Sequence, residues 1–359
     1  MMHLLNMKHI SLLLATVALL LGTTSCFKHE DPDPSGEITF TYGAYFLNAG
    51  VSGVSEITQL DNLLAMVTPH CYASANDGKQ LGNGACDIHI FGTKMYVTLA
   101  GSKRIKVVGQ NNCKDLDSFT ISADDGTSLT PAYLADFEGM LLVSLKEGYV
   151  ASVDTVNYKV RNLLKLNAGA GCVAIANQKL YVACPDGNAI LMLNPVDLHV
   201  MKTLDVEQPR SFAVASDNHL YLVAGQDETS LLQVNSDNEA ITRITTTGQP
   251  QKVAAGPDKA LIVLVKVTSD EVGDKFLVVN IENLSVDGEF IRDGSYVKDP
   301  TGLFIDPNTG NVYVSQDGES GGDYGLIYIY TGYGQYLTSF NTGTARTVGA
   351  AFVTGSTGK

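Results

Sequence analysis

The sequence predicts an all-β fold, a seven-bladed β-propeller with four antiparallel strands per blade, and three observations predict it. A short apolar phrase with a branched or aromatic centre recurs seven times. The gaps between successive centres are 51, 46, 39, 40, 41 and 51 residues, which is the spacing of one four-stranded blade per repeat. No stretch after residue 26 has the length and periodicity of a helix. A two-sheet sandwich is the alternative, but it does not repeat a four-strand unit seven times. The centres are Tyr45, Tyr96, Leu142, Tyr181, Tyr221, Ile262 and Tyr313.

The clearest copy of the repeat runs from Gly171 to Val206. Its first strand is expected at 173–176, a tight turn at Asn177–Lys179 and a second strand at 180–183. A turn cluster at 185–188 precedes the third strand, 190–193. Residues 200–204 alternate between apolar and polar, as an outer strand with one wet face should. The same order recurs at 131–166, 210–245 and 300–340.

The two ends of the repeat array complement each other. Thr347–Val353 reads as a first strand that no second strand follows, and the blade that begins near Gly43 lacks a first strand. We therefore expect the C-terminal strand to complete the N-terminal blade and to close the ring, which removes two exposed sheet edges.

Residues 1–25 have the layout of a signal peptide, because Lys8 and His9 precede an apolar run that is short for a membrane span. Cys26, directly after small residues, resembles the lipidation site of bacterial lipoproteins, which implies cleavage before Cys26 and lipidation there. An ordinary secretory signal that happens to contain a cysteine is the alternative. We expect a lipidated tether at 26–40 and the propeller at 41–359.

The residues after Cys26 bear on where the protein is displayed. Phe27-Lys28-His29-Glu30-Asp31 resembles the export signal of Bacteroidetes lipoproteins that reach the outer face of the outer membrane. A solvated tether is the alternative, and residues 31–36 have that composition.

The net charge of the chain limits which classes of partner it can bind. The formal net charge is −14, and the 24 basic residues are scattered, so no basic stripe exists to neutralise phosphates. Nucleic acid is therefore excluded as a partner. No linker interrupts the repeats, so a single ring is expected.

Five cysteines remain after Cys26: Cys71, Cys86, Cys113, Cys172 and Cys184. An exported protein could oxidise them. If the hairpin turns at Asn177–Lys179, Cys172 and Cys184 fall opposite each other, and a disulfide or two free thiols are both open there. Because five is odd, at least one thiol is free or paired with another chain. The pairing is not fixed by the sequence.

Catalytic and metal motifs are not found in the sequence. No nucleophile elbow, zinc-protease helix motif or phosphate loop occurs, so we expect no enzyme, no cofactor and no metal site. His89 sits in a strand, where a packed or half-exposed side chain is favoured over a ligand. The acidic loop 316–324 could hold calcium through three carboxylates, but a solvated hairpin tip is favoured.

A ligand site is expected on one face of the ring, near the channel. Four connections on that face are enlarged, 48–56, 68–84, 267–275 and 316–325, and they belong to the contiguous blades six, seven, one and two. Any one of these residues alone could be an ordinary surface side chain, so we infer a site only because they cluster on one face. The candidate ligand-binding residues are Tyr72, Asn83, Arg210, Gln226, Asp227, Gln251, Gln316, Asp317, Tyr324 and Arg346.

Three phrases carry a family resemblance: Tyr45–Gly50, Asp87–Val97 and Pro300–Val314. On these the chain resembles the YncE-like propeller lipoproteins of Bacteroidetes, whose cobalamin-capturing members sit on a TonB-dependent outer-membrane transporter. The resemblance implies a surface lipoprotein that captures a corrinoid and passes it to such a transporter, monomeric apart from that transporter. A propeller module that binds a protein or a glycan is the alternative function.

Overall fold

The structure, a computed structural model, describes residues 38–357 apart from 51–52, 226–228, 268–272 and 319–323. Its compact body is Thr39–Gly355. The predicted signal peptide and Cys26 lie outside the described residues, so lipidation and the domain boundaries stay predictions.

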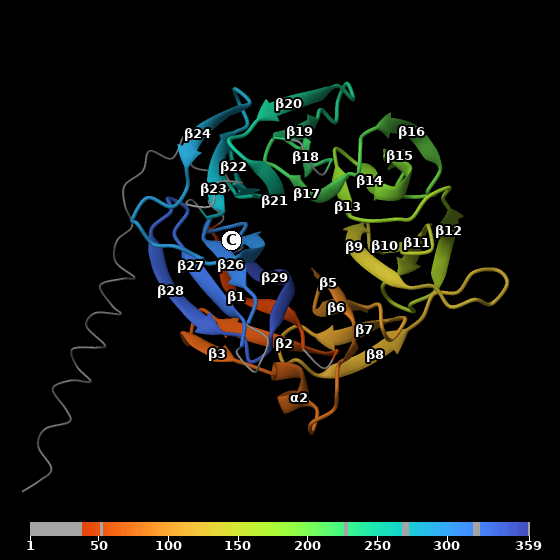
Figure 1. Ribbon diagram of the computed structural model, residues 1–359. Helices are drawn as coiled ribbons and strands as arrows, with labels where there is room; N and C mark the ends of the chain where they lie inside the picture. The colour runs from red at the N-terminus through yellow and green to blue at the C-terminus, as the bar shows by residue number, and fades with distance from the viewer. Residues whose placement is uncertain (1–37, 51–52, 226–228, 268–272, 319–323, 358–359) are drawn as a thin grey trace, which may run out of the picture. The chain divides into compact units, whose positions relative to one another are not determined.

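Within the described residues, seven sheets form the body, and each sheet is one blade (Figure 1). From its innermost to its outermost strand, blade one consists of β29 (Arg346–Thr357), β1 (Ile38–Ala49), β2 (Val54–Asp61) and the short β3 (Met66–Thr68), with β4 (Gly82–Asn83) also paired to β2. Blade two consists of β5 (Ala85–Phe91), β6 (Lys94–Leu99), β7 (Arg104–Gly109) and β8 (Asp115–Phe119). Blade three consists of β9 (Pro131–Phe137), β10 (Met140–Leu145), β11 (Tyr149–Asp154) and β12 (Val160–Lys165).

The other four blades follow the same order. Blade four consists of β13 (Val173–Ala176), β14 (Lys179–Cys184), β15 (Ala189–Leu193) and β16 (Val200–Asp205). Blade five consists of β17 (Arg210–Val214), β18 (Leu220–Val223), β19 (Ser230–Val234) and β20 (Ile241–Thr245). Blade six consists of β21 (Gln249–Ala255), β22 (Ala260–Lys266), β23 (Lys275–Asn280) and β24 (Ser285–Glu289). Blade seven consists of β25 (Pro300–Ile305), β26 (Val312–Gln316), β27 (Leu326–Tyr330) and β28 (Tyr336–Asn341).

The core lies between blades, which explains the repeated phrase. The seven centres occupy the second strands, and all seven are buried. Tyr96 of blade two, for example, packs with Leu141 and Val153 of blade three. The second strand is apolar because neighbouring blades cover both of its faces. We expected the outer strand to expose one face and bury the other. In β16 only Leu204 is buried, so this strand is exposed to solvent along most of its length.

The ring closes as predicted, since β29 pairs with β1 in the sheet of blade one. A second contact reinforces the closure from blade seven: Thr41 on β1 donates a 2.6 Å hydrogen bond to Asp306, which is fully buried. The N-terminal strand β1 is therefore held both by the C-terminal strand β29 and by blade seven.

Blade one has an interrupted outer strand. β3 pairs with one end of β2 and β4 pairs with the other. Between them the chain forms the short helix α2 (Cys71–Ala75), whose Cys71 and Tyr72 are buried in the core beside β2. A disulfide joins Cys71 to Cys113 in the turn after β7. The long 68–84 connection thus folds against the outer rim of the ring (Figure 1), so its helix does not add to the wall that we expected around the channel.

Of the two possibilities left open for Cys172 and Cys184, the structure has two free thiols, and the hairpin register gives the reason. β13 and β14 are joined by two residues, Asn177 and Gln178, which have φ values of 44° and 59°. Two positive φ values are typical of a type I′ turn, the favoured two-residue hairpin connection. The shorter turn shifts the register by one residue, which moves the two cysteines to opposite faces of the sheet. Cys86, Cys172 and Cys184 are free thiols.

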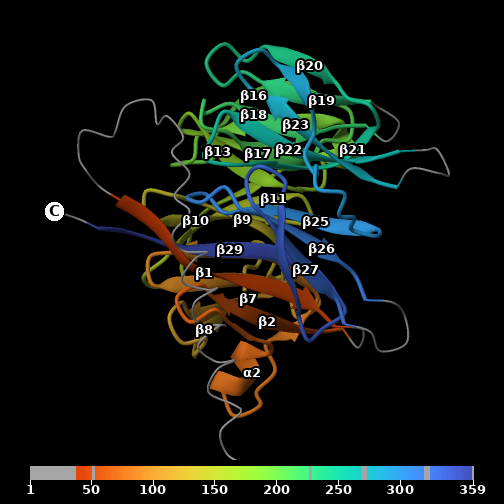
Figure 2. The same ribbon diagram turned by 90° about the vertical axis from the view of Figure 1, so that its left-hand side faces the viewer.

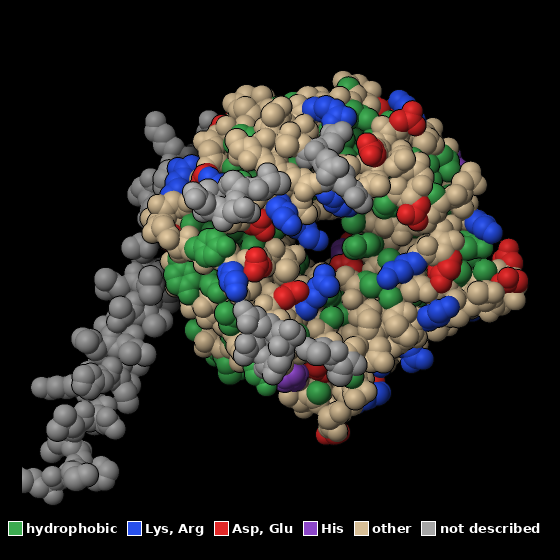
Figure 3. Space-filling model, in the orientation of Figure 1, with side chains coloured by type: hydrophobic (Ala, Val, Ile, Leu, Met, Phe, Trp, Pro, Cys, Tyr) green, Lys and Arg blue, Asp and Glu red, His purple; other side chains and the backbone are tan. Residues whose placement is uncertain are grey.

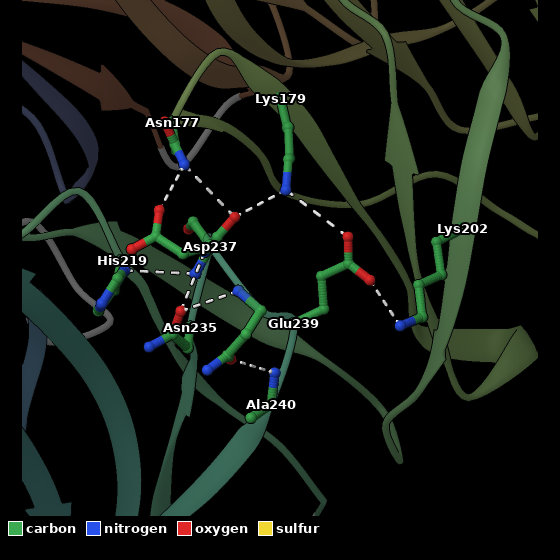
Figure 4. A network of polar contacts seen from close by, with 10 residues as sticks. Asn177, Lys179, Lys202, His219, Asn235, Asp237, Glu239 and Ala240 are labelled. Carbon is green, nitrogen blue, oxygen red and sulfur yellow. Dashed lines mark hydrogen bonds and ion pairs between the residues drawn. The ribbon is translucent and has the colours of Figure 1, made fainter.

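Polar contacts lock neighbouring blades together. Tyr45 of blade one donates to the carbonyl of Gln110 in blade two, and Tyr96 of blade two donates to Thr155 in blade three. Between blades four and five, Lys179 donates a 2.7 Å hydrogen bond to the carbonyl of Ser236, and Asn177 donates one of 2.7 Å to Asp237 (Figure 4). The blades are held in a fixed geometry by these bonds as well as by the apolar core.

The antiparallel strands give the ring two different faces. We call the face that carries the second-to-third and fourth-to-first connections the loop face. We call the opposite face, which carries the first-to-second and third-to-fourth turns, the turn face. Figure 2 shows the ring from the side, with β1 beginning and β29 ending at the turn face. The chain therefore enters the ring on the side opposite to the predicted ligand site.

Candidate ligand-binding face

A recess with a volume of about 660 Å³ opens on the loop face, at blades four, five and six. Blade four contributes its second-to-third connection, and blades five and six contribute the entries to their first strands. The recess brings together the predicted residues Arg210 and Gln251. Its lining consists of Pro185, Asp186, Asn188, Gln208, Arg210, Gln249 and Gln251.

Arg210 is the cation of this recess and is positioned by backbone carbonyls. Its guanidinium donates to the carbonyl of Gly225 and, at 3.4 Å, to that of Pro250. Burial lowers the pKa of Arg210, because the charged form loses hydration. The strand pairing is irregular between Arg210 and Phe212, where Ser211 has φ of 51°. The site thus holds one oriented guanidinium with no carboxylate bonded to it among the described residues.

Amide side chains supply most of the remaining polar lining. The Gln251 amide nitrogen donates a 3.2 Å hydrogen bond to the carbonyl of Gln249, so the two glutamines are arranged as a pair. Asn188 has φ of 48° at the end of the 3₁₀ turn Pro185–Gly187, and its side chain accepts from the backbone of Gln208. Such amides offer donors and acceptors without a net charge, so they can pair with neutral polar groups of a ligand.

A second group of predicted residues gathers at blade seven. Asp317 lies 3.6 Å from the Arg346 guanidinium and accepts a 2.7 Å hydrogen bond from Thr301. Gln316 accepts a 2.9 Å hydrogen bond from Tyr328. The Asp317 carboxylate is therefore already occupied by an arginine and a hydroxyl. Residues 319–323 of the acidic loop lie outside the described residues.

The other predicted residues are dispersed. Tyr72 has no exposed surface, because α2 inserts it into the core, and a ligand cannot reach it. Asn83 and Tyr324 are exposed, the latter with 56 % of its surface accessible. Gln226 and Asp227 lie outside the described residues.

Sequence reasoning missed five residues of the recess: Pro185, Asp186, Asn188, Gln208 and Gln249. A signal for two of them existed. Gln208-Pro209-Arg210 and Gln249-Pro250-Gln251 stand 41 residues apart, which is also the spacing of the repeat there. A polar residue that repeats with the blade period must occupy the same place in successive blades, here beside the channel mouth.

The channel itself carries titratable side chains from the inner strands of blades two and three. His89 Nε2 lies 2.7 Å from Asp136 Oδ1. Asp87 accepts hydrogen bonds from the backbone of Ile88 and Leu134, yet burial dominates and raises its pKa to about 6. Figure 3, which views the loop face, shows the central opening with Lys and Arg side chains around it. Asp and Glu side chains stand beside them in the same view, so the mouth of the channel carries charges of both signs.

Two negative findings concern the described residues only. Ranges 38–357, with the gaps given above, contain no group of three or more His, Cys, Asp or Glu that could hold a metal ion. In the same part of the chain, no helix has the length and apolar character needed to cross a membrane.

Comparisons with known proteins agree with the fold. A protein-family model described as "Domain of unknown function (DUF5074)" matches residues 42–263, more than half of the chain. No curated protein sequence matches the chain. A solved structure titled "Dihydro-heme d1 dehydrogenase NirN in complex with DHE" is 9% identical with a TM-score of 0.60, over 92% of this chain and 78% of that one. The hydrazine synthase of Kuenenia stuttgartiensis is 15% identical with a TM-score of 0.57, over 69% of this chain and 76% of that one. At these identities both likenesses concern the fold.

Proposed function

We propose that the chain, which belongs to the DUF5074 family, is a non-enzymatic propeller that captures a large polar ligand on its loop face, with a corrinoid such as cobalamin as the leading candidate. The observation that carries the proposal is the recess at blades four to six, where Arg210 stands among amide side chains. A preformed recess on a rigid ring avoids most of the reorganisation that binding otherwise requires.

The chemistry of the recess suits such a ligand. A cobalamin carries many amide side chains and a phosphate. Gln208, Gln249 and Gln251 would pair with the amides, and the Arg210 guanidinium would pair with the phosphate. Across the channel mouth, the exposed ring of Tyr324 would cover flat apolar surface with little loss of side-chain entropy.

The proposal extends to the location of the protein. On the resemblance to YncE-like lipoproteins, Cys26 would anchor the propeller to the outer membrane, facing the cell exterior, and a TonB-dependent transporter would receive the ligand. Cys26→Ser should release the protein from membranes. Replacing Lys28, Glu30 and Asp31 with Ala should keep it facing inward, out of reach of protease added to intact cells. Unchanged accessibility in that variant would refute the export step.

A protein or glycan partner is the second candidate function. Tyr296 and Tyr324 support it, because they expose 57 % and 56 % of their surface on the loop face, and exposed tyrosines serve as contact residues for such partners. The absence of tryptophan from the chain counts mildly against a glycan platform.

Isothermal titration with cyanocobalamin separates these candidates. Arg210→Ala and Gln251→Ala should each weaken binding by about 2 kcal/mol, some thirtyfold in affinity, if they are anchors. Arg161→Ala is the matched control, because Arg161 is an exposed arginine on an outer strand that pairs with Asp154 outside the recess. If the wild-type protein gives no heat of binding with any corrinoid, cobalamin is ruled out as the ligand, and binding of a protein or a glycan becomes the better proposal.

A further inference from the structure

The five most exposed large apolar side chains of the described residues lie on one face of the ring. Val156, Leu63, Leu64, Val196 and Tyr333 expose 82, 73, 69, 61 and 60 % of their surface. Each belongs to a turn between a third and a fourth strand, and all these turns lie on the turn face. Single exposed apolar residues are ordinary, but their concentration at equivalent tips of one face is not.

The turns present these side chains through a shared geometry. The residue that ends the third strand, or follows it, accepts a hydrogen bond from the backbone two positions later. Asp61 accepts from Leu63, Asp154 from Val156, and Asn194 from Val196, all at 2.8–2.9 Å. In blade seven, Thr331 accepts from Tyr333 in the same way. Such turns hold the tip residue outward, away from the core.

The apolar tips occupy one side of the face. They belong to blades seven, one, three and four, and the turn of blade two that lies among them, residues 110–114, carries no exposed large apolar side chain. The corresponding tips of blades five and six are Asp237 and Glu282. Asp237 is held by Asn177 of the neighbouring blade (Figure 4), and Glu282 pairs with Lys259. The turn face therefore has an apolar arc and an acidic arc.

The chain enters the ring within the apolar arc. β1 belongs to blade one and begins at the turn face, and Ile38 follows Cys26 by twelve residues. Twelve extended residues span at most about 40 Å. If Cys26 is lipidated, as the proposed function holds, the start of β1 on the turn face is always within that distance of the bilayer.

We propose that the turn face docks on the lipid bilayer, with Leu63, Leu64, Val156, Val196 and Tyr333 in the headgroup region. This inference rests on the proposed lipid anchor. The tips stand on separate blades and do not form one continuous patch, which suits a fluid surface that takes each side chain separately rather than the compact hot spot of a protein partner. The acidic arc lifts away from the membrane, and the loop face with its recess stays clear of the lipid.

The absence of tryptophan from the chain provides a sharp test. The full-length, host-processed protein is prepared with one tryptophan at an exposed position: Val156→Trp or Val196→Trp on the turn face, and Tyr296→Trp on the loop face as the control. Each variant is reconstituted into phosphatidylcholine vesicles with or without brominated phosphatidylcholine. We expect blue-shifted emission that the brominated lipid quenches at positions 156 and 196, and unshifted, unquenched emission at position 296.

Flotation reports on the lipid anchor, and quenching reports on docking of the turn face. Protein that floats with the vesicles but shows no quenching at 156 and 196, or equal quenching at 296, overturns the docking alone and leaves a protein partner for this face. Protein that does not float overturns the anchor and the docking together. Flotation with quenching confined to 156 and 196 supports both.

Discussion

The hydroxyl of Thr347 donates a 2.7 Å hydrogen bond to the side-chain oxygen of Asn48, 299 residues earlier in the chain. The Asn48 amide donates in turn to Thr58 at 2.9 Å, and Thr58 donates to the carbonyl of Thr342 at 2.6 Å. All four residues are buried. The two ends of the ring are therefore joined by a continuous set of buried polar contacts in addition to the strand pairing of β29 with β1.

Thr347→Val should destabilise the ring by about 1–3 kcal/mol, because it leaves the buried oxygen of Asn48 without its donor. Thr338→Val is the control, since Thr338 is exposed on the outer strand β28, and it should change stability by less than about 0.5 kcal/mol. Urea unfolding measures both. Deletion of residues 346–359 should have a larger effect than Thr347→Val, because it removes the whole of β29 and leaves the edge of β1 unpaired. Equal unfolding midpoints for wild type and the deletion would contradict the closure.

The Cys71–Cys113 disulfide should contribute about 4 kcal/mol on the chain-entropy model, because it closes a loop with a sequence separation of 42. Cys71→Ser with Cys113→Ser should therefore unfold at much lower urea. Cys172→Ser with Cys184→Ser is the matched control, because both thiols are free. Reducing agent should lower the urea midpoint of this control by as much as it lowers that of wild type, and should not change the midpoint of the Cys71→Ser, Cys113→Ser variant. Peptide mapping without reduction should recover a fragment that joins residues 71 and 113. A fragment joining 172 to 184 instead would refute this assignment.

Glu56 should make stability depend on pH. Burial raises its pKa to about 7 from 4.5, against backbone hydrogen bonds that lower it. Since the folded state favours the protonated acid, the stability that Glu56 contributes is fully present below about pH 4.5 and is lost as the pH rises through 7. Glu56→Gln should therefore gain stability relative to wild type between pH 4.5 and pH 8. Thermal unfolding across that range measures the difference. The exposed Glu138→Gln is the control, and a constant difference between Glu56→Gln and wild type would contradict the prediction.

Tyr96 and Lys94 should be coupled. Both donate to the carbonyl of Thr155 in the next blade, at 3.3 and 2.9 Å. Tyr96→Phe alone should cost no more than about 1 kcal/mol, because Lys94 still satisfies the carbonyl. Tyr96→Phe with Lys94→Met should cost more than the sum of the two single changes, since the carbonyl is then buried without a donor. Strict additivity in a double-mutant cycle would show that the shared carbonyl does not matter.

The repeat predicted the blades and the closure because both depend on period and on apolar character, which are visible in the sequence. The length of a single turn depends on one or two residues and is not visible in the repeat. Whether the hairpin after β13 turns on two residues or three depends on Asn177 and Gln178 both adopting positive φ, and that choice decides which face Cys172 occupies.

The candidate site was predicted in part for a related reason. Arg210 and Gln251 lie in the recess because they belong to the first residues of first strands, a position that the repeat fixes. Tyr72 is buried because its connection folds into a helix that fills the gap between β3 and β4, and no periodic pattern marks a five-residue helix. The recess combines three blades, so the repeat alone could not show which of the seven would form it.

Blade one has a consequence for biosynthesis. Its innermost strand, β29, is the last to be synthesised, whereas its second strand, β1, is the first. A growing chain that has not reached residue 346 therefore keeps β1 without its inner partner, however many other blades have formed. Long-range pairing of this kind is slow and favours folding late. A translation product that ends before β29 therefore keeps the inner edge of β1 unpaired, and a chain that includes β29 covers that edge.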